Sequence, residues 1–213
     1  APSGVVTVAL LPWMMHSIAG DLFDSVRKTY PGITLRMIEG FSGRNEELLA
    51  DGRADIALIG RYRKTASRGE EVLISTHLSL VGPRQKEVAG LPPTITFREL
   101  AKVPLVLPSM PHGLRVAINA VARHKRLKMN VVAEADSSEA QKAIMSRQGC
   151  FMVLSPQTVG RELARGTLHA REIVEPRVPR LVVMSTTTHR PLSRAAREVA
   201  GIVRKLVREA ASF

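Results

Sequence analysis

The sequence contains a single cysteine, Cys150, among its 213 residues. One thiol cannot form a disulfide within the chain, and it cannot build a zinc cluster from thiolates. Because proteins of oxidising compartments commonly use disulfides, this composition favours the cytosol. Cys150 lies in the apolar run 149–154, where a thiol usually packs as a small hydrophobic side chain rather than acting as a nucleophile.

Long hydrophobic runs are also missing, since Arg, Asp, Lys or Pro interrupts every apolar stretch before it reaches the roughly 18 residues that span a bilayer. The sequence therefore predicts no transmembrane helix. The first four residues, Ala-Pro-Ser-Gly, have neither an initiator Met nor a basic segment followed by an apolar one. This start is typical of an excised fragment or of a processed, mature chain.

Aromatic residues are scarce, with five Phe, two Tyr and one Trp, although 31 Lys and Arg against 19 acidic residues give a net charge of +12. Single-stranded nucleic acids are usually bound through stacking aromatics, and duplexes through a reading helix on a basic stripe. We expect the densest basic run, residues 123–128, to be a solvated helix end. The charge suits anionic ligands or simply solubility.

Signatures of catalysis are absent as well. The sequence has no GxSxG nucleophile elbow, no GxxxxGK[ST] phosphate loop, no HExxH zinc helix and no GxGxxG turn. Its six histidines are scattered singly, without the spacing of metal ligands. We therefore predict neither an enzyme nor a resident cofactor or metal; measurable turnover of a bound carboxylate would revive a small α/β enzyme as an alternative.

Helical patterns alternate with short apolar strands through most of the chain, which predicts an α/β fold built from parallel βαβ units. The chain is long enough for two lobes of about 100 residues. Strands are expected at residues 5–11, 33–39, 54–60, 72–82, 104–107, 130–133, 150–154 and 181–187, and helices at 17–30, 43–50, 114–126, 138–147, 157–165 and 193–211.

Four short loops rich in Ser, Gly, His and Pro each separate a predicted strand from a predicted helix, at residues 13–17, 41–44, 109–114 and 136–138. In open α/β sheets, ligands collect beyond the carboxyl ends of the strands, where helix starts present free backbone N–H groups to anions. The loops predict a binder of small anions in a cleft between two lobes. Alternatively, Ser17, Ser42, Ser109 and Ser137 only cap helices.

The order of these motifs resembles the effector-binding domain of LysR-type transcriptional regulators, over essentially the whole chain. The stretch 29–42 contains Tyr30-Pro31 and ends an extended segment in Glu-Gly, and 47–59 carries Leu49, Gly52 and Asp55 at fixed spacing. The stretches 4–12, 78–83, 148–156 and 181–185 follow in the same order. Residues 107–115 and 130–136 are similar to the branch associated with nitrogen-assimilation control.

This resemblance implies two Rossmann-like lobes with a central cleft, as in type II periplasmic binding proteins. Lobe I would comprise residues 1–84 plus 187–213, and lobe II residues 85–186. The family's N-terminal winged helix-turn-helix is absent from this sequence, so we expect the chain to be a fragment that binds DNA weakly and nonspecifically at most. The apolar faces of helix 18–30 and of the terminal helix are candidate dimer surfaces, or else ordinary core.

By position, the resemblance also implies a set of effector-binding residues. Many family members place a Ser or Thr at the start of the first loop, where this chain has bulky side chains that would narrow the cleft, favouring a flat or partly apolar ligand, or close it. His16 and His112 are possible hydrogen-bond donors or ordinary loop histidines. The implied residues are Trp13, Met14, Met15, His16, Ser42 and Gly43 in lobe I, and Ser109, His112, Gly113, Leu114, Cys150 and Phe151 in lobe II.

The function expected from these observations is that of a cytoplasmic sensory domain. A small organic anion, such as a carboxylate, would bind between the lobes and change their closure. That change would rearrange a homodimer or homotetramer and so reposition DNA-binding domains, which would be the only contact with DNA. The alternative is a mature exported solute-binding protein for a small anion, whose gene would encode a signal segment upstream.

Overall fold

The computed structural model describes residues 1–84 and 92–211, which divide into two compact units. The first unit comprises Ala1–Ser75 and Leu181–Phe213, and the second Thr76–Arg180. The boundaries predicted at 84/85 and 186/187 lie several residues later in the chain. The stretch 79–83 pairs within the sheet of the second unit, and residues 85–91 lie outside the described part.

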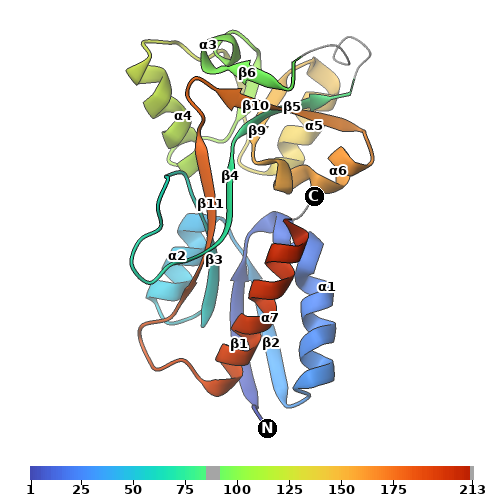
Figure 1. Cartoon of the computed structure of the whole chain (residues 1–213), viewed down its shortest axis with the longest axis vertical. Coiled ribbons are helices and arrows are strands. Elements are labelled where there is room, and N and C mark those ends of the chain that lie inside the picture. The colour runs from blue at the N-terminus through green and yellow to red at the C-terminus, as the bar shows by residue number, and fades with distance from the viewer. Residues whose placement is uncertain (85–91, 212–213) are drawn as a thin grey trace. The chain divides into compact units, whose positions relative to one another are not determined.

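The first unit contains a five-stranded mixed sheet in the order β2-β1-β3-β11-β4 (Figure 1). Strand β1 runs parallel to β2 and β3, whereas β11 is antiparallel to β3. Its elements are β1 (Gly4–Leu10), α1 (Pro12–Thr29), β2 (Ile33–Glu39), α2 (Ser42–Ala50), β3 (Ile56–Arg61), β4 (Glu71–His77), β11 (Pro179–Thr186) and α7 (Arg194–Ala210).

The two faces of this sheet are covered by different helices. Helices α1 and α7 lie side by side on one face, where they bury Val6, Val8 and Leu10 of β1 (Figure 1). On the other face, Leu48 of α2 packs over the small Ala9 together with Ala57. The alternation of large and small side chains along β1 follows from the period of two residues in a strand.

The apolar stripes of α1 and α7 are the core of the first unit, so of the two interpretations of these faces, ordinary core is confirmed and a dimer surface is wrong. Ile18, Leu22 and Val26 of α1 are at most 2% exposed, and Val199 and Val203 of α7 are fully buried. An amphipathic helix that covers a sheet shows the same period as one that covers a partner. The exposed apolar side chain on α1 is Phe23, which lies outside this stripe.

The second unit contains a six-stranded mixed sheet in the order β6-β10-β5-β9-β7-β8. Val81, Val106 and Met152 of three neighbouring strands meet Met145 of α5 in its core. The elements are β5 (Ser79–Pro83), β6 (Thr94–Thr96), α3 (Phe97–Leu100), β7 (Leu105–Leu107), α4 (Gly113–His124), β8 (Val131–Glu134), α5 (Ser138–Gln148), β9 (Phe151–Leu154), the 3₁₀ turn η2 (Pro156–Val159), α6 (Gly160–Ala164) and β10 (Leu168–Val174).

Two differences from the predicted elements bear on the site. Helix α1 begins at Pro12 rather than at residue 17, because proline fits the first helical position and Leu11 provides the extended residue before it. The predicted strand 72–82 is two strands, β4 and β5, which belong to different sheets.

Candidate functional site

Residues 13–16 form the first turn of α1, directly after β1, and do not form a loop. Met14 is fully buried in the core of the first unit, Trp13 and Met15 are half-buried against that core, and His16 is exposed. The indole N–H of Trp13 is buried and has no hydrogen-bond partner among the described residues. An unsatisfied buried donor costs about 1–3 kcal/mol, so this N–H favours an acceptor from outside the chain.

Ser42 is the first residue of α2, and its role is more than capping. Phe41 takes the capping position, while the Ser42 hydroxyl oxygen accepts the backbone N–H of Gly60 at 2.9 Å. This bond fixes the start of α2 against the carboxyl end of β3, and it leaves the Ser42 hydroxyl hydrogen as a donor. Gly43 is exposed, and a side chain at its position would meet nothing within 4 Å.

In the second unit, Ser109 and Asp136 join the carboxyl ends of the parallel strands β7 and β8. The backbone N–H and the hydroxyl of Ser109 both donate to Oδ1 of Asp136, at 2.8 and 2.7 Å. These two bonds lower the pKa of the Asp136 carboxyl, and the bond from the Ser109 hydroxyl contributes more than the bond from the Ser109 backbone N–H. The exposed carboxylate is therefore ionised at neutral pH, and it can accept a further donor at its other oxygen.

His112 caps the start of α4, where its Nδ1 accepts the backbone N–H of Leu114 at 3.2 Å. Burial lowers the pKa of the His112 imidazole, and the positive charge of Arg180 lowers it further, while Asp136 acts in the opposite direction. The ring is therefore neutral at pH 7. Since Nδ1 is an acceptor, the neutral ring carries its proton on Nε2 and presents a donor there.

The other predicted residues of the second unit lie close to its core. Leu114 and Cys150 are 5% and 1% exposed, and Gly113 is exposed. Phe151 is half-buried, with its ring against Gly82, where any Cβ would lie 2.4 Å from a ring carbon. Ser137 caps α5 by accepting the backbone N–H of Ala140, as the capping interpretation of that serine predicts.

The structure brings together Ser109, His112 and Gly113 at the carboxyl end of β7, and it joins Asp136 and Arg180 to them through the contacts above. Arg180 is 7% exposed and was not predicted. The only signal for it was a basic residue at the edge of the apolar strand 181–187. Gln157, which follows β9, was also missed; its buried Oε1 has no partner among the described residues.

A surface depression of about 300 Å³ lies elsewhere on the second unit, between α4 and the segment that leads to β8. Its lining includes Leu127, Met129 and Val131. None of the predicted effector residues lines it, although Gly113 and Leu114 belong to the same helix, α4. The guanidinium of Arg115 in this wall is already paired with Glu134 at 2.7 Å. The lining also includes the exposed Arg123, so an anion in the depression would meet the charge of Arg123 and not that of Arg115.

Residues 1–84 and 92–211 contain no group of three or more His, Cys, Asp or Glu side chains that could hold a metal ion. Within the same residues, every helix is too short or too polar to cross a membrane.

Comparison with known proteins places this geometry in a family. Residues 1–208 match the family model described as the LysR substrate binding domain. The nitrogen assimilation regulatory protein nac of Escherichia coli (strain K12) is 25% identical over 164 residues, which are 76% of this chain and 52% of that protein. The transcriptional activator CmpR of Synechocystis is 25% identical over 152 residues, or 71% of this chain and 50% of that protein. The chain thus spans about half the length of these curated relatives, which are transcriptional regulators and not enzymes.

Solved structures show the same fold. The effector binding domain of QuiR in complex with shikimate has a TM-score of 0.76 at 15% identity, over 98% of this chain and 99% of that one. The regulatory domain of CcmR from Synechocystis PCC6803 in complex with 2-PG has a TM-score of 0.78 at 18% identity, over 99% of both chains. These likenesses confirm the predicted α/β fold of the type II periplasmic binding proteins. Because the family model covers nearly its whole length, the chain belongs to the LysR substrate binding domain family.

Proposed function

We propose that this chain is the ligand-sensing domain of a bacterial transcriptional regulator, and that it binds a small organic anion between its two lobes in the cytosol. The observation that carries the proposal is the start of α4 in the second unit. There a neutral His112 with its donor at Nε2 follows Ser109, and the buried Arg180 supplies a positive potential. Helix starts and fixed donors of this kind suit a carboxylate or phosphate.

The ligand also has to satisfy the ionised Asp136, whose exposed carboxylate repels a bare anion. An effector with a hydroxyl or amino group beside its acidic group would donate to Asp136 and offset that repulsion. The QuiR domain is in complex with shikimate and the CcmR domain with 2-PG, which fits a class of small organic acids. We therefore propose a hydroxy acid, amino acid or small phosphorylated acid as the effector.

The first unit would contribute the hydroxyl of Ser42 and the unpartnered indole N–H of Trp13. Lobe I (1–84 plus 187–213) and lobe II (85–186), with the twelve residues predicted above, remain the proposed frame of this site. The buried Met14, Leu114 and Cys150 would support it from within the two cores. Ligand binding would favour one arrangement of the lobes, rearrange a homodimer or homotetramer, and so act on DNA through the helix-turn-helix that full-length relatives carry.

Thermal unfolding against a panel of hydroxy acids, amino acids, dicarboxylates, aromatic acids and inorganic anions tests the proposal. A ligand at about 100 times its Kd should stabilise the fold by about 2.7 kcal/mol. His112→Asn keeps a good helix cap but removes the ring donor, so it should abolish the shift. His77→Asn, at a partly exposed histidine of the same unit whose Nδ1 lies 3.4 Å from Glu172, is the control and should keep the shift. No shift with any compound, or equal shifts in both variants, would overturn the assignment.

A further inference from the structure

The positive charge of the chain is concentrated in the second unit. Residues 76–180 contain 16 basic and eight acidic residues, a net charge of +8, while the 15 basic and 11 acidic residues of the first unit leave +4. Within the second unit, residues 100–133 include six Lys and Arg and no Asp or Glu at all. The effector site does not use most of this charge.

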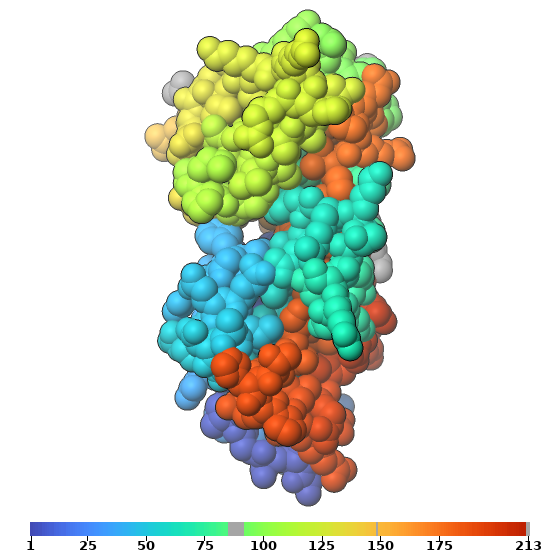
Figure 2. Space-filling view, turned by 90° about the vertical axis from the view of Figure 1, so that its left-hand side faces the viewer, coloured from blue at the N-terminus to red at the C-terminus, as the bar shows by residue number. Residues whose placement is uncertain are grey.

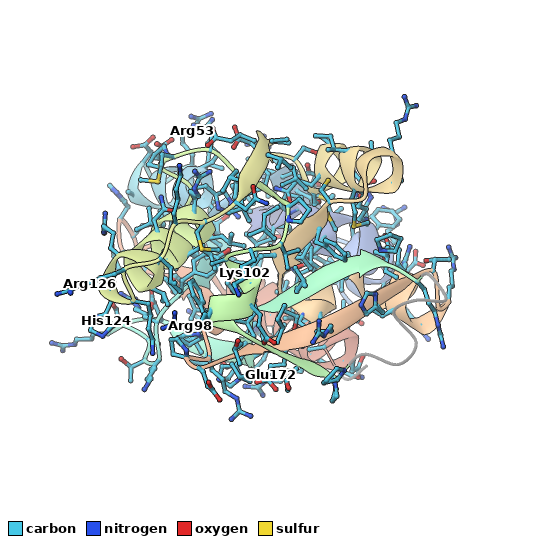
Figure 3. The ribbon with its side chains drawn as sticks, turned by 90° about the horizontal axis from the view of Figure 1, so that it is seen from above. Arg53, Arg98, Lys102, His124, Arg126 and Glu172 are labelled. Carbon is cyan, nitrogen blue, oxygen red and sulfur yellow. The ribbon has the colours of Figure 1, made fainter. Side chains whose placement is uncertain are left out.

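The fold adds two further cations to the basic run at 123–128. The segment after α4 returns to the end of α3, where the backbone N–H of Asn130 donates to the carbonyl of Ala101 at 3.1 Å and its side chain donates to the carbonyl of Lys102 at 3.3 Å. Figure 3 shows Arg98, His124 and Arg126 on the side of the second unit where α3 and the end of α4 lie. We call the resulting set the basic surface: Arg98, Lys102, Arg123, Lys125, Arg126 and Lys128.

All six side chains of the basic surface are exposed, and none forms an ion pair within residues 1–84 and 92–211. The acids that flank the acid-free stretch are already engaged. Glu99 accepts the backbone N–H and hydroxyl of Thr96 at 2.9 and 2.7 Å, and Glu134 pairs with Arg115. Arg115 thus neutralises Glu134, whereas Glu99 keeps its negative charge and interacts with Lys102. The six cations of this surface therefore face one nearby carboxylate and otherwise solvent.

Stabilisation of the α4 end explains only part of this set. Cations in the last turn of a helix interact favourably with its carboxyl end, which accounts for Arg123 and His124. It does not account for Arg98 and Lys102, which lie on and after α3, or for Lys128 beyond α4.

Arg126 argues further against a merely structural role. It has a left-handed backbone with φ of 54°, just after the end of α4. The equivalent left-handed positions after α2, α5 and α6 are Gly52, Gly149 and Gly166, as expected where a Cβ is unfavourable. At this one helix end the chain accepts the cost of a non-glycine residue and gains an exposed guanidinium.

We infer that the basic surface binds the phosphate backbone of double-stranded DNA without reading its sequence. The surface offers separated point charges and no exposed aromatic anchor, which suits a regularly charged polyanion better than a folded protein partner. The choice of DNA rests on the proposed function, since a DNA-binding regulator brings this domain close to a duplex. The contact would supplement the helix-turn-helix of the full-length protein.

Fluorescence anisotropy of a labelled 30-bp duplex of arbitrary sequence, titrated with this chain at several salt concentrations, tests the inference. If all six cations engage phosphates, the slope of log K against log salt should be about −5. The variant Arg98→Gln/Lys102→Gln/Lys125→Gln/Lys128→Gln should bind at least about tenfold more weakly at 50 mM salt, with a slope reduced by about 3 to 4.

The matched control removes four exposed, unpaired cations from the first unit: Lys28→Gln/Arg36→Gln/Arg53→Gln/Lys64→Gln. It has the same net charge as the test variant and should keep nearly wild-type affinity and slope. Equal losses in both variants would show that only net charge matters and would overturn the inference. Competition by polyglutamate as effective as by unlabelled duplex, at equal charge, would assign the surface to an acidic protein instead. Ligand-induced thermal shifts, measured on the same variants, report the effector site separately.

Discussion

The two units differ in how their charged groups are arranged, although each contains both ion pairs and unpaired cations. In the first unit, charged groups are paired across elements: Glu71 of β4 receives two hydrogen bonds from Arg204 and one from Arg208 of α7, and Asp55 joins Arg190 to the buried backbone of β1. Figure 2 shows the surface where α2 adjoins the segment that follows β3. Arg61, the last residue of β3, forms ion pairs with Glu46 of α2 and with Glu70 of that segment. In the second unit, six cations are left unpaired on one surface.

This contrast separates charges that hold a fold together from charges that are available to a partner. An ion pair that is partly buried and hydrogen-bonded contributes to stability, and losing one partner is costly. An exposed cation without a partner contributes little to folding. Removal of a paired charge such as Asp55 or Glu71 should therefore destabilise the first unit, whereas removal of cations from the basic surface should leave the stability of the second nearly unchanged.

The largest effect is expected from two matched aspartate substitutions. Asp55 is 6% exposed and accepts the backbone N–H of Thr7 at 2.8 Å, so Asp55→Ala should lower the free energy of unfolding by about 2–4 kcal/mol. Asp136 also accepts two bonds, but it is exposed, and Asp136→Ala should cost about 1 kcal/mol or less. Urea unfolding followed by circular dichroism measures both, and equal losses would break the contrast.

A smaller, pH-dependent effect is expected at Glu71. The hydrogen bond from Arg204 lowers the pKa of the Glu71 carboxyl, against a smaller opposing contribution from burial. A lowered pKa stabilises the fold above the usual value near 4.5, and this stabilisation is lost as the pH falls through the lowered pKa. Glu71→Gln should cost about 1 kcal/mol at pH 7, because the pair is partly exposed and screened, and this cost should shrink as the pH falls through the lowered pKa.

Glu209→Gln provides the control for Glu71, since its pair with Lys205 on α7 is exposed and 3.8 Å long. Its unfolding free energy should follow that of the wild type between pH 3 and 7. A difference for Glu71→Gln that persists unchanged at pH 3 would show that the carboxylate charge is not its source.

The smallest effect has the opposite sign. Arg126→Gly relieves the left-handed backbone and should raise the free energy of unfolding by about 0.5–1 kcal/mol, while it weakens duplex binding. Arg123→Gly removes the same side chain from the helical last turn of α4 and should lower stability by about 1 kcal/mol. Thermal unfolding of the two variants compares them directly. If Arg126→Gly does not stabilise the fold, the backbone of Arg126 is unstrained.

Most elements of the first unit were predictable because local patterns decide them. Strand 33–39 matches β2, and the helix predicted at 43–50 differs from α2 by one residue. The second unit was harder to predict: β10 places Arg171 and Glu172 in a strand without an apolar alternation, and it was missed. The division of 72–82 was also missed, since an apolar pattern does not show where a chain leaves one sheet for another.

The candidate site divides in the same way. Ser109 and His112 were predictable because each lies between a strand and the helix that follows it. The bond from Ser109 to Asp136 crosses 27 residues of sequence, and Arg180 acts on His112 from 68 residues away, so neither partner leaves a local pattern. For the same reason, the sequence showed the basic run at 123–128 but not its extension by Arg98 and Lys102.

The order of the elements along the chain has a consequence for synthesis. The second unit is one continuous segment, Thr76–Arg180, whereas the first needs β11 and α7 from the last 33 residues to complete its sheet and cover its core. On the ribosome, the second unit can fold as soon as it emerges, but β1 and its neighbours must wait, with one face covered only by α1, until β11 and α7 have been made. The segment Ala1–Ser75 is therefore more exposed to chaperones and to aggregation during translation than the second unit, although it precedes that unit in the chain.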